Sequence, residues 1–377
     1  MNLIPVARPS LGPEELAAVG RVFDSRWLGL GAVTAEFEDR LSAMVGARPV
    51  VATNTGTTAI ELALRTIGIG PGDDVITPAM TFVATAQAIA ATGATPILCD
   101  IDPVSLNATA ETLEQARTPR TRAVVPVDYR GLPVNVAQIT RWASGHGIRV
   151  VIDAAHSFGS KLDDGALVGS TGDITCFSFD PIKNITCGEG GAIVFSSEKE
   201  CDTAAKLRVL GIDSTAWSRL EAKRPWEYDV RGPGFRFHMP NFAAAIGLAQ
   251  LDRLDEFRAT KQATLGQYIR ELKGRTDFTV ADFPVDRCMP FLAVLTTEHR
   301  SELMDHLREH GVGSGVQYQP LSAFTAFSRC GQAKLPVTES FADSLVTIPI
   351  LNDQTREETD TVVQAVMSFD PRGSQVQ

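Results

Sequence analysis

The sequence predicts an α/β fold, in which a mostly parallel central sheet carries helices on both faces and a smaller C-terminal α+β domain follows. Three observations support this prediction. Over the first two thirds of the 377 residues, short apolar runs alternate with helical patterns, as in proteins built from strand–helix–strand units. Glycine and proline mark the joins, for example in the turn over residues 70–73. From about Asp252 a long charged helical pattern begins.

The apolar runs predict the strands of the large sheet. They are Val50–Ala52, Asp74–Thr77, Pro96–Asp100, Ala123–Val127, Val150–Asp153, Cys176–Phe179 and Ala192–Phe195. The predicted helices include Thr57–Ile67, Thr81–Ala91, Val136–Gly145 and Asn241–Leu251. In open parallel sheets, ligands bind in the crevice at the carboxyl ends of the strands. Polar residues that follow these runs are therefore the first candidates for a functional site.

The C-terminal third predicts the smaller domain. A long helix over Asp252–Lys273 leads to strand-like Met289–Leu295, helix-like Ser301–His310, the short segments Val316–Tyr318 and Val346–Pro349, and a last helix from Thr355. We therefore expect a large domain over residues 1–251 and a smaller one over residues 252–377.

Composition excludes several classes of protein. The 35 lysine and arginine residues against 45 aspartate and glutamate residues give a net charge of −10, which argues against nucleic acid or an anionic membrane surface as the main partner. Gln87, Thr92 and Gly93 interrupt the longest Ala-rich stretch, so we expect no membrane span. The six cysteines are scattered and the start does not resemble a signal peptide. Both features favour a cytoplasmic enzyme with reduced thiols.

Lys183 and Asp153 are the first candidates for chemistry. Lys183 lies between an apolar strand and the glycine-rich residues 188–191. An amine in a partly desolvated site has a lowered pKa and can form a Schiff base. The alternative is a solvated loop lysine. Asp153 ends an apolar run, where a carboxylate can pair with the pyridinium nitrogen of pyridoxal 5′-phosphate (PLP). The alternative is a helix N-cap.

A polar loop and an aromatic side chain extend this pattern. Residues 53–58 lie between a strand and a helix, where free backbone N–H groups and hydroxyls bind phosphate without net positive charge. Simple helix capping is the alternative. Phe82 follows a strand and could stack on a planar cofactor, although such a residue is more often part of a core. Ser178, on the strand before Lys183, could reach the phosphate.

These segments together resemble the DegT-type sugar-aminotransferase family of fold-type-I PLP enzymes. The resemblance covers most of the chain, closely to about Leu251 and loosely beyond. It rests on residues 27–29, 55–59, 68–73, 81–85, 153–157, 177–179, 183–186, 188–191 and 244–251. It implies a PLP-dependent aminotransferase in which Lys183 forms the Schiff base and moves the proton.

The resemblance also implies roles for individual residues. Asp153 would hold the pyridine nitrogen, His156 would lie beside the ring and count as catalytic with Lys183 and Asp153, and Phe82 would stack on the ring. The phosphate would be held by Gly56, Thr57 and Ser178. Trp27, Leu28 and Tyr318 would contact the acceptor. The family is typically a homodimer with shared active sites, and Arg236 or His238 would reach the cofactor phosphate in the active site of the neighbouring chain.

The substrates implied are glutamate as amino donor and a nucleotide-linked keto sugar as acceptor. Residues 210–219 resemble the branch that aminates C4, which favours a TDP-4-keto-6-deoxyhexose over amination at C3. Many relatives carry histidines at the positions of Gln317 and Ser322, near the diphosphate of the acceptor. Their absence keeps a keto-inositol acceptor, which lacks a nucleotide, as an alternative. A related branch of the family catalyses dehydration and has histidine at the position of Lys183. The lysine therefore argues against dehydration here.

Readings from other classes remain. His306 and His310 match the inverted zinc-peptidase motif, and two histidines four apart on a helix can share a metal. The alternative is a surface helix whose last turn carries His310. No third ligand is evident in the sequence, so we expect no metal site. A non-enzymatic protein of the PLP fold would not need Lys183, Asp153 and the polar loop together. No complete dinucleotide fingerprint is present, which argues against a dehydrogenase.

Overall fold

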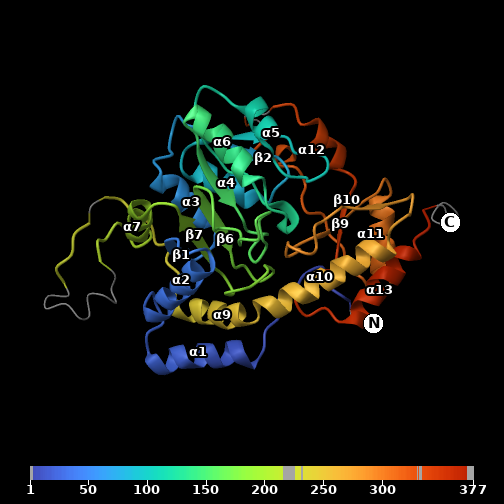
Figure 1. The fold of residues 1–377 in the computed structure, drawn as a ribbon, viewed down its shortest axis with the longest axis horizontal. Helices are drawn as coiled ribbons and strands as arrows, with labels where there is room; N and C mark the ends of the chain where they lie inside the picture. The colour runs from blue at the N-terminus through green and yellow to red at the C-terminus, as the bar shows by residue number, and fades with distance from the viewer. Residues whose placement is uncertain (1–2, 215–225, 231, 329, 331–332, 372–377) are drawn as a thin grey trace.

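A seven-stranded sheet forms the centre of the larger part of the molecule (Figure 1). The computed structural model describes residues 3–214, 226–230, 232–328, 330 and 333–371. The strand order is β1-β7-β6-β5-β4-β2-β3. The strands are β1 (Val50–Thr53), β2 (Asp74–Pro78), β3 (Thr95–Cys99), β4 (Thr121–Val124), β5 (Arg149–Asp153), β6 (Ile174–Ser178) and β7 (Gly191–Phe195). Strand β7 runs antiparallel to β1 and β6, and the other neighbouring pairs are parallel. The predicted mostly parallel sheet is confirmed.

Helices cover both faces of this sheet because alternate strand residues point to opposite sides. Ala52 and Ile76 pack toward one face, and Val51 and Val75 toward the other. The first face is covered by α2 (Ala32–Met44), α5 (Ala110–Ala116) and α6 (Val136–His146), and the second by α3 (Gly56–Thr66), α4 (Val83–Ala91) and α7 (Glu198–Leu207). Helix α1 (Pro13–Ser25) packs on α9 (Asn241–Asp252). The sheet is therefore buried, which explains its unbroken apolar strands.

A second, three-stranded antiparallel sheet lies in the C-terminal part, with strand order β10-β9-β8. Its elements are β8 (Thr279–Val280), β9 (Ala293–Thr296) and β10 (Leu345–Ile348), with helices α10 (Leu254–Glu271), α11 (Arg300–Glu309), α12 (Pro336–Phe341) and α13 (Arg356–Met367). Short 3₁₀ turns lie at η1 (Tyr129–Gly131) and η2 (Leu321–Ala323). Ile4 packs into the same core as Leu295 and Val362, and it pairs with Val312. The N-terminal residues thus pack with the C-terminal part.

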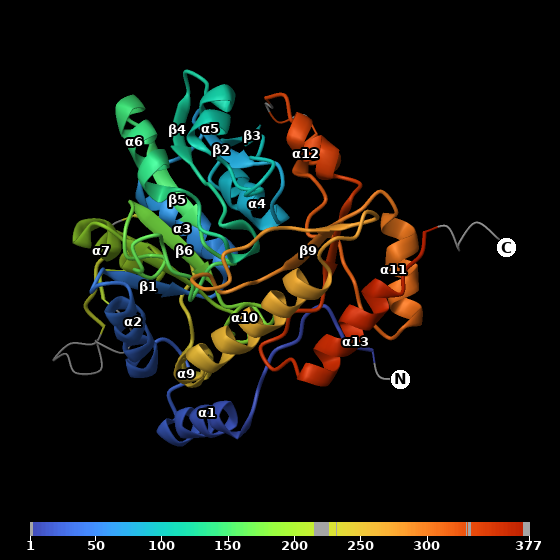
Figure 2. The same ribbon diagram turned by 45° about the vertical axis from the view of Figure 1, so that its right-hand side comes forward.

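Helices α9 and α10 run almost end to end beneath the large sheet and lead to α11 and α13 (Figures 1 and 2). The sequence predicted two helices meeting at residues 251 and 252. In the structure the break falls at Arg253, whose φ of −101° and ψ of 0° interrupt the helical path. The division into domains 1–251 and 252–377 stays a prediction.

One C-terminal strand differs from expectation. The predicted strand over Met289–Leu295 begins only at Ala293, because Met289 N–H is bonded to the Ser160 hydroxyl and Phe291 N–H to the carbonyl of Arg130. Residues 316–318 form no strand, and only the neighbouring Gly315 bridges to Thr347. Helices α1, α2, α5, α7 and α12 were not among the predicted helices. Across the described ranges, every helix is too short or too polar to cross a bilayer.

Candidate active site

A cavity of about 470 Å³ lies at the carboxyl edge of the large sheet. Strand β5 ends there with Asp153, β6 ends with Ser178, and α3 begins there after β1. Because β7 runs antiparallel to β6, the loop between them returns across the same edge and carries Lys183. Residues from the C-terminal part close the other side, and they are Phe291, Leu292, Gln317, Tyr318, Ile348 and Ile350.

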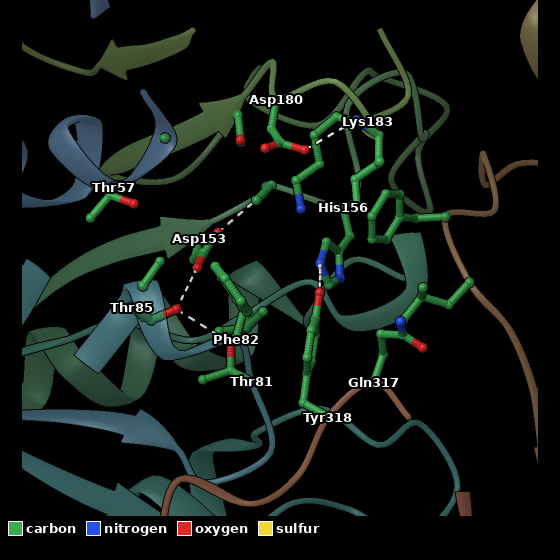
Figure 3. Close-up of a pocket in the computed structure, with 18 of the residues that line it drawn as sticks. Thr57, Thr81, Phe82, Thr85, Asp153, His156, Asp180, Lys183, Gln317 and Tyr318 are labelled. Atoms are coloured by element: carbon green, nitrogen blue, oxygen red, sulfur yellow. Dashed lines mark hydrogen bonds between the residues drawn. The ribbon is translucent and has the colours of Figure 1, made fainter. Parts of the chain in front are cut away.

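Lys183 extends into this cavity (Figure 3). Its backbone N–H donates to the carbonyl of Asp180 at 3.0 Å, which fixes the turn that carries it. Its Nζ lies 4.5 Å from the ring centre of Phe291. Burial lowers the pKa of the Lys183 amine to about 8, although Asp153 and Asp180 favour the charged form. A substantial neutral fraction near neutral pH is what an amine needs to act as nucleophile and base.

Asp153 is 5% exposed and accepts two hydrogen bonds. The Thr85 hydroxyl donates to Oδ2 at 2.7 Å, and the backbone N–H of Ala155 donates to Oδ1 at 3.1 Å. Residues 155–159 form turns and no helix begins there, so Asp153 does not cap a helix. Burial raises the pKa of this carboxyl group, whereas the two hydrogen bonds and Lys183 oppose the rise. The side chain is thus held in one orientation at the floor of the cavity.

His156 is buried beside Lys183 and is held by aromatic rings. Its ring stacks on Phe291 with 4.1 Å between centres, and its Nε2 lies 3.1 Å from the hydroxyl of Tyr318. Burial and the nearby lysine charges keep the pKa of His156 well below its usual value, so the ring is neutral. Its Nδ1 is buried and has no hydrogen-bond partner among the described residues. The neutral imidazole ring of His156 is therefore held in one orientation on the side of the cavity.

The N-terminus of α3 forms a cradle of hydroxyls and amides. Thr55 caps the helix by accepting a hydrogen bond from the N–H of Thr58 at 3.0 Å. A Cβ added at Gly56 would lie 2.6 Å from Cβ of Ser178, so only glycine permits this approach. Within the described ranges, the hydroxyls of Thr57 and Ser178 have no protein partner. Both residues line the cavity, where an anionic group can use them.

The glycines after Lys183 allow its loop to pack closely against the N-terminus of α3. A Cβ on Gly191 would lie 2.3 Å from the carbonyl oxygen of Thr55. The sequence predicted that backbone comes close to something at residues 188–191. The structure identifies that neighbour as the loop before α3, so the glycines bring the Lys183 loop against the cradle.

The aromatic side chains and the unpredicted residues complete the lining. Phe82 is the N-cap residue of α4, is 52% exposed, and its ring lies 5.6 Å from that of Tyr318. Sequence reasoning missed Thr85 and Asp180, which also line the cavity. Gln317, which the sequence placed near the acceptor, lines it too. Thr85 belongs to a segment that had been singled out only for Phe82. Its bond to Asp153 spans 68 positions and leaves no local pattern in the sequence.

Other predicted residues lie outside this cavity in the single chain. The indole N–H of Trp27 donates to the carbonyl of Leu30 at 2.9 Å, and Leu28 is 46% exposed between α1 and α2. Arg236 and His238 form isolated β-bridges with Val209 and Thr53. None of these four side chains lines the cavity that contains Lys183.

Of the two histidines of the zinc-peptidase motif, His306 contacts α13 and His310 bonds back to its own helix. His306 Nε2 is 3.0 Å from the carbonyl of Ala365, and His310 Nδ1 is 2.8 Å from the carbonyl of His306. Among the residues described, no three His, Cys, Asp or Glu side chains gather in a way that could hold a metal ion. These contacts leave the zinc-peptidase alternative without structural support.

Comparison with protein families gives one match that spans nearly the whole chain. Residues 9–367 match the model of the DegT/DnrJ/EryC1/StrS aminotransferase family. The chain belongs to this family. It is an aminotransferase, and the family and enzyme class predicted from the sequence are confirmed.

Individual members of the family are similar over almost their full length. The spore coat polysaccharide biosynthesis protein SpsC of Bacillus subtilis is 35% identical over 379 residues, which cover 97% of this chain and 96% of SpsC. Among solved structures, the aminotransferase TlmJ from Streptoalloteichus hindustanus superposes with a TM-score of 0.89 at 32% identity, covering 97% and 98% of the two chains. The PLP-form of the putative sugar aminotransferase Spr1654 from Streptococcus pneumoniae gives 0.87 at 28% identity, covering 97% of each.

Proposed function

We propose that this aminotransferase moves an amino group from glutamate to a keto sugar linked to a nucleotide, at C4 of a TDP-4-keto-6-deoxyhexose. The observation that carries the proposal is the placement of Lys183. Its amine lies in a desolvated cavity with a pKa of about 8, near the buried carboxyl of Asp153. A base of this pKa can take up and return a proton close to neutral pH.

The cavity fits pyridoxal phosphate, which is the cofactor. The hydroxyls of Thr57, at the N-terminus of α3, and of Ser178, at the end of β6, have no partner among the described residues and are suited to its phosphate. Asp153, fixed by Thr85, would hold the protonated pyridine nitrogen. Phe82 would stack on one face of the ring. When bound, the cofactor supplies an electron sink for the carbanion formed at the substrate.

The remaining chemistry belongs to side chains of this protein. Lys183 would bind the cofactor covalently and, once displaced by the donor amine, move the proton at the reacting carbon with its Nζ. His156, neutral and stacked on Phe291, would keep the ring in place from the side. The apolar residues Leu292, Ile348 and Ile350 would exclude water from the reacting atoms.

The acceptor has a second candidate because of one observation about charge. Among the described residues, no arginine lines the cavity. A nucleotide diphosphate would have to find its cationic contacts beyond this lining, whereas a keto-inositol needs none. We therefore keep a keto-inositol as the second acceptor candidate, in line with Gln317 and Ser322 standing where many relatives have histidine.

We further propose that the protein is a homodimer with shared active sites, in which Arg236 or His238 reaches the cofactor phosphate of the neighbouring site. Arg236 and His238 lie outside the cavity of their own chain, as side chains would that reach a neighbour's site. The oligomeric state is tested by light scattering, and the role of Arg236 by mixing inactive Lys183→Ala chains with inactive Arg236→Ala chains. Recovery of activity on mixing requires a shared site.

All six cysteines are free thiols, which suits the reducing cytoplasm and supports our proposal of a cytoplasmic enzyme.

An acceptor screen tests the substrates. The cofactor-loaded enzyme is incubated with ¹⁵N-glutamate and with TDP-, UDP- or GDP-linked 4-keto and 3-keto sugars, or with keto-inositols. We expect ¹⁵N in the TDP-4-keto-6-deoxyhexose product by mass spectrometry. Labelling of only the keto-inositol would select the second candidate. Loss of visible cofactor absorbance on adding glutamate tests the donor separately, and an unchanged spectrum would contradict it.

A further inference from the structure

A second buried lysine lies close to Lys183. Lys261, on α10, is 2% exposed, which is rare for lysine because burial removes the hydration of its charge. Its Nζ lies 5.7 Å from the ring centre of Phe291, the same ring that Lys183 approaches to 4.5 Å. Within the described ranges, no carboxylate lies within 4.0 Å of Lys261. The two amines therefore share an apolar neighbourhood, and Lys261 has no counter-ion there.

Among the described residues, the hydrogen bond that the Lys261 side chain makes leads back to the Lys183 loop. Its Nζ donates to Oδ1 of Asn184, the residue after Lys183, at 2.9 Å. Because an ammonium can only donate, this contact fixes which way the amide of Asn184 points. The Nδ2 of Asn184 then donates to the carbonyls of His156 and Phe158, at 3.1 and 3.0 Å. Lys261 thus ties α10 to both the Lys183 loop and the His156 turn.

The electrostatic surroundings of the pair are defined by few groups. Lys261 faces Lys183 and His156, and Lys183 also faces Asp153 and Asp180. Burial and the charge of Lys183 lower the pKa of Lys261 to about 7. Since the repulsion between two cations is mutual, the charge of Lys261 must also disfavour the charged form of Lys183. Two amines that interact in this way titrate as a pair.

We propose that Lys261 is a positioning residue for Lys183, which holds Asn184 and places a second positive charge that favours the neutral, reactive amine of Lys183. The proposal deepens the proposed function, because it rests on the role given there to Lys183. In the singly protonated pair, the proton resides part of the time on Lys261. During that time Lys183 carries a free electron pair, although the pair of lysines still holds one charge.

The test measures the reactivity of Lys183 in the protein without cofactor. Trace acetic anhydride acetylates neutral amines, and the acetylated Lys183 peptide is quantified by mass spectrometry as a function of pH. Lys261→Met removes the charge and should lower the labelling of Lys183 at a fixed pH below 7, where Lys261 is charged, by about three- to tenfold, since one pKa unit is a factor of ten. Lys261→Arg keeps a permanent charge and should raise the labelling or leave it unchanged.

The opposite responses of the two variants separate charge from structure. Lys273→Met, an exposed lysine just beyond the end of α10, is the matched control and should leave the profile of Lys183 in place. If Lys261→Met does not fold, Lys261→Gln replaces it, because it removes the charge and keeps a donor for Asn184. The labelling of Lys183 must then fall in Lys261→Gln and not in Lys261→Arg. Equal profiles in all variants, or a fall in labelling in both Lys261→Met and Lys261→Arg, would overturn the proposal.

This measurement does not depend on aminotransfer. A failed acceptor screen with the predicted labelling order would reject the proposed substrates and leave the lysine pair intact. The reverse result would keep the proposed function and remove Lys261 from it.

Discussion

The cavity has two walls of different character. The sheet wall, made of Thr57, Asp153, His156, Ser178 and Lys183, carries titratable groups and hydroxyls at the ends of strands. The C-terminal wall, made of Phe291, Leu292, Gln317, Tyr318, Ile348 and Ile350, is mostly apolar. The difference teaches that reactivity needs both walls. The first supplies the amine and the carboxylate, and the second supplies the dry surroundings that lower the pKa of Lys183.

The largest effect is expected on the sheet wall, from Lys183→Ala. Loss of the amine removes both the covalent attachment and the proton transfer, so aminotransfer should fall at least about 10³-fold, in line with general acid–base catalysis. The cofactor should still bind without a covalent bond. Turnover is measured with ¹⁵N-glutamate, and Lys199→Ala on the exposed face of α7 is the control. Retained turnover would reject the role of Lys183.

Asp153→Asn should have the next largest effect. The amide cannot hold a protonated pyridine nitrogen as a carboxylate does, so kcat should fall about 10²-fold or more, a loss of a charged hydrogen bond plus its electrostatic effect. Spectroscopic titration should also show weaker cofactor binding. Asp180→Asn removes another carboxylate of the same cavity and should cost less. Equal losses in both variants would mean that the cavity needs negative charge but no particular partner for the ring.

Tyr318→Phe tests whether the C-terminal wall only binds and excludes water. The variant loses the hydroxyl that lies 3.1 Å from His156 Nε2. We expect KM for the acceptor to rise about three- to tenfold, the value of one hydrogen bond, with little change in kcat. Steady-state kinetics separate the two constants. A collapse of kcat comparable to that of Asp153→Asn would place chemistry on both walls and break the comparison.

The smallest effect concerns stability as a function of pH. In the unfolded chain Lys183 has a pKa near 10.5, and in the fold it is lowered to about 8. Between these values the unfolded state binds more protons, so the contribution of Lys183 to stability rises with pH through this window. Below about pH 8 the buried charge is destabilising. Lys183→Met should therefore raise Tm of the cofactor-free protein by a few degrees below pH 8.

The same variant should lose this advantage as the pH approaches 10.5. The measurement is thermal unfolding of the wild type and Lys183→Met, once below pH 8 and once near pH 10.5. Only the difference in Tm between the two proteins is used, because Asp128 and Asp153 also titrate with raised pKa values. A constant difference in Tm would show that the C-terminal wall does not desolvate Lys183.

Much of the sheet wall could be predicted from the sequence. The strands are short apolar runs because the sheet is buried on both faces, and Asp153 and Ser178 are the last residues of β5 and β6. Parallel strands bring their carboxyl ends to one edge by geometry alone. Lys183 and Gly56 follow from the same rule. Trp27, Leu28, Arg236 and His238, by contrast, were assigned by resemblance alone, and the roles of all the site residues stay predictions.

The C-terminal wall could not be predicted in this way. The sequence singled out residues 316–318 only as a short segment, whereas the structure places Tyr318 of this segment against His156. Phe291 lies in a run that resembled a strand, but its N–H is bonded to the carbonyl of Arg130 and its ring stacks on His156. These contacts join residues far apart in the chain, and local patterns carry no information about them.

The sequence by itself therefore predicted the family and the sheet, which are confirmed, and the candidate side chains for the chemistry, because residue type and position after a strand are local properties of the chain. Only the tertiary structure decided how reactive those side chains are. Thr85 orients Asp153 from another element, and Lys261 reaches Asn184 across 77 positions. Burial lowers the pKa of Lys183 although Asp153 and Asp180 oppose it, since the stability of a charge depends on everything packed around it and not on its neighbours in the chain.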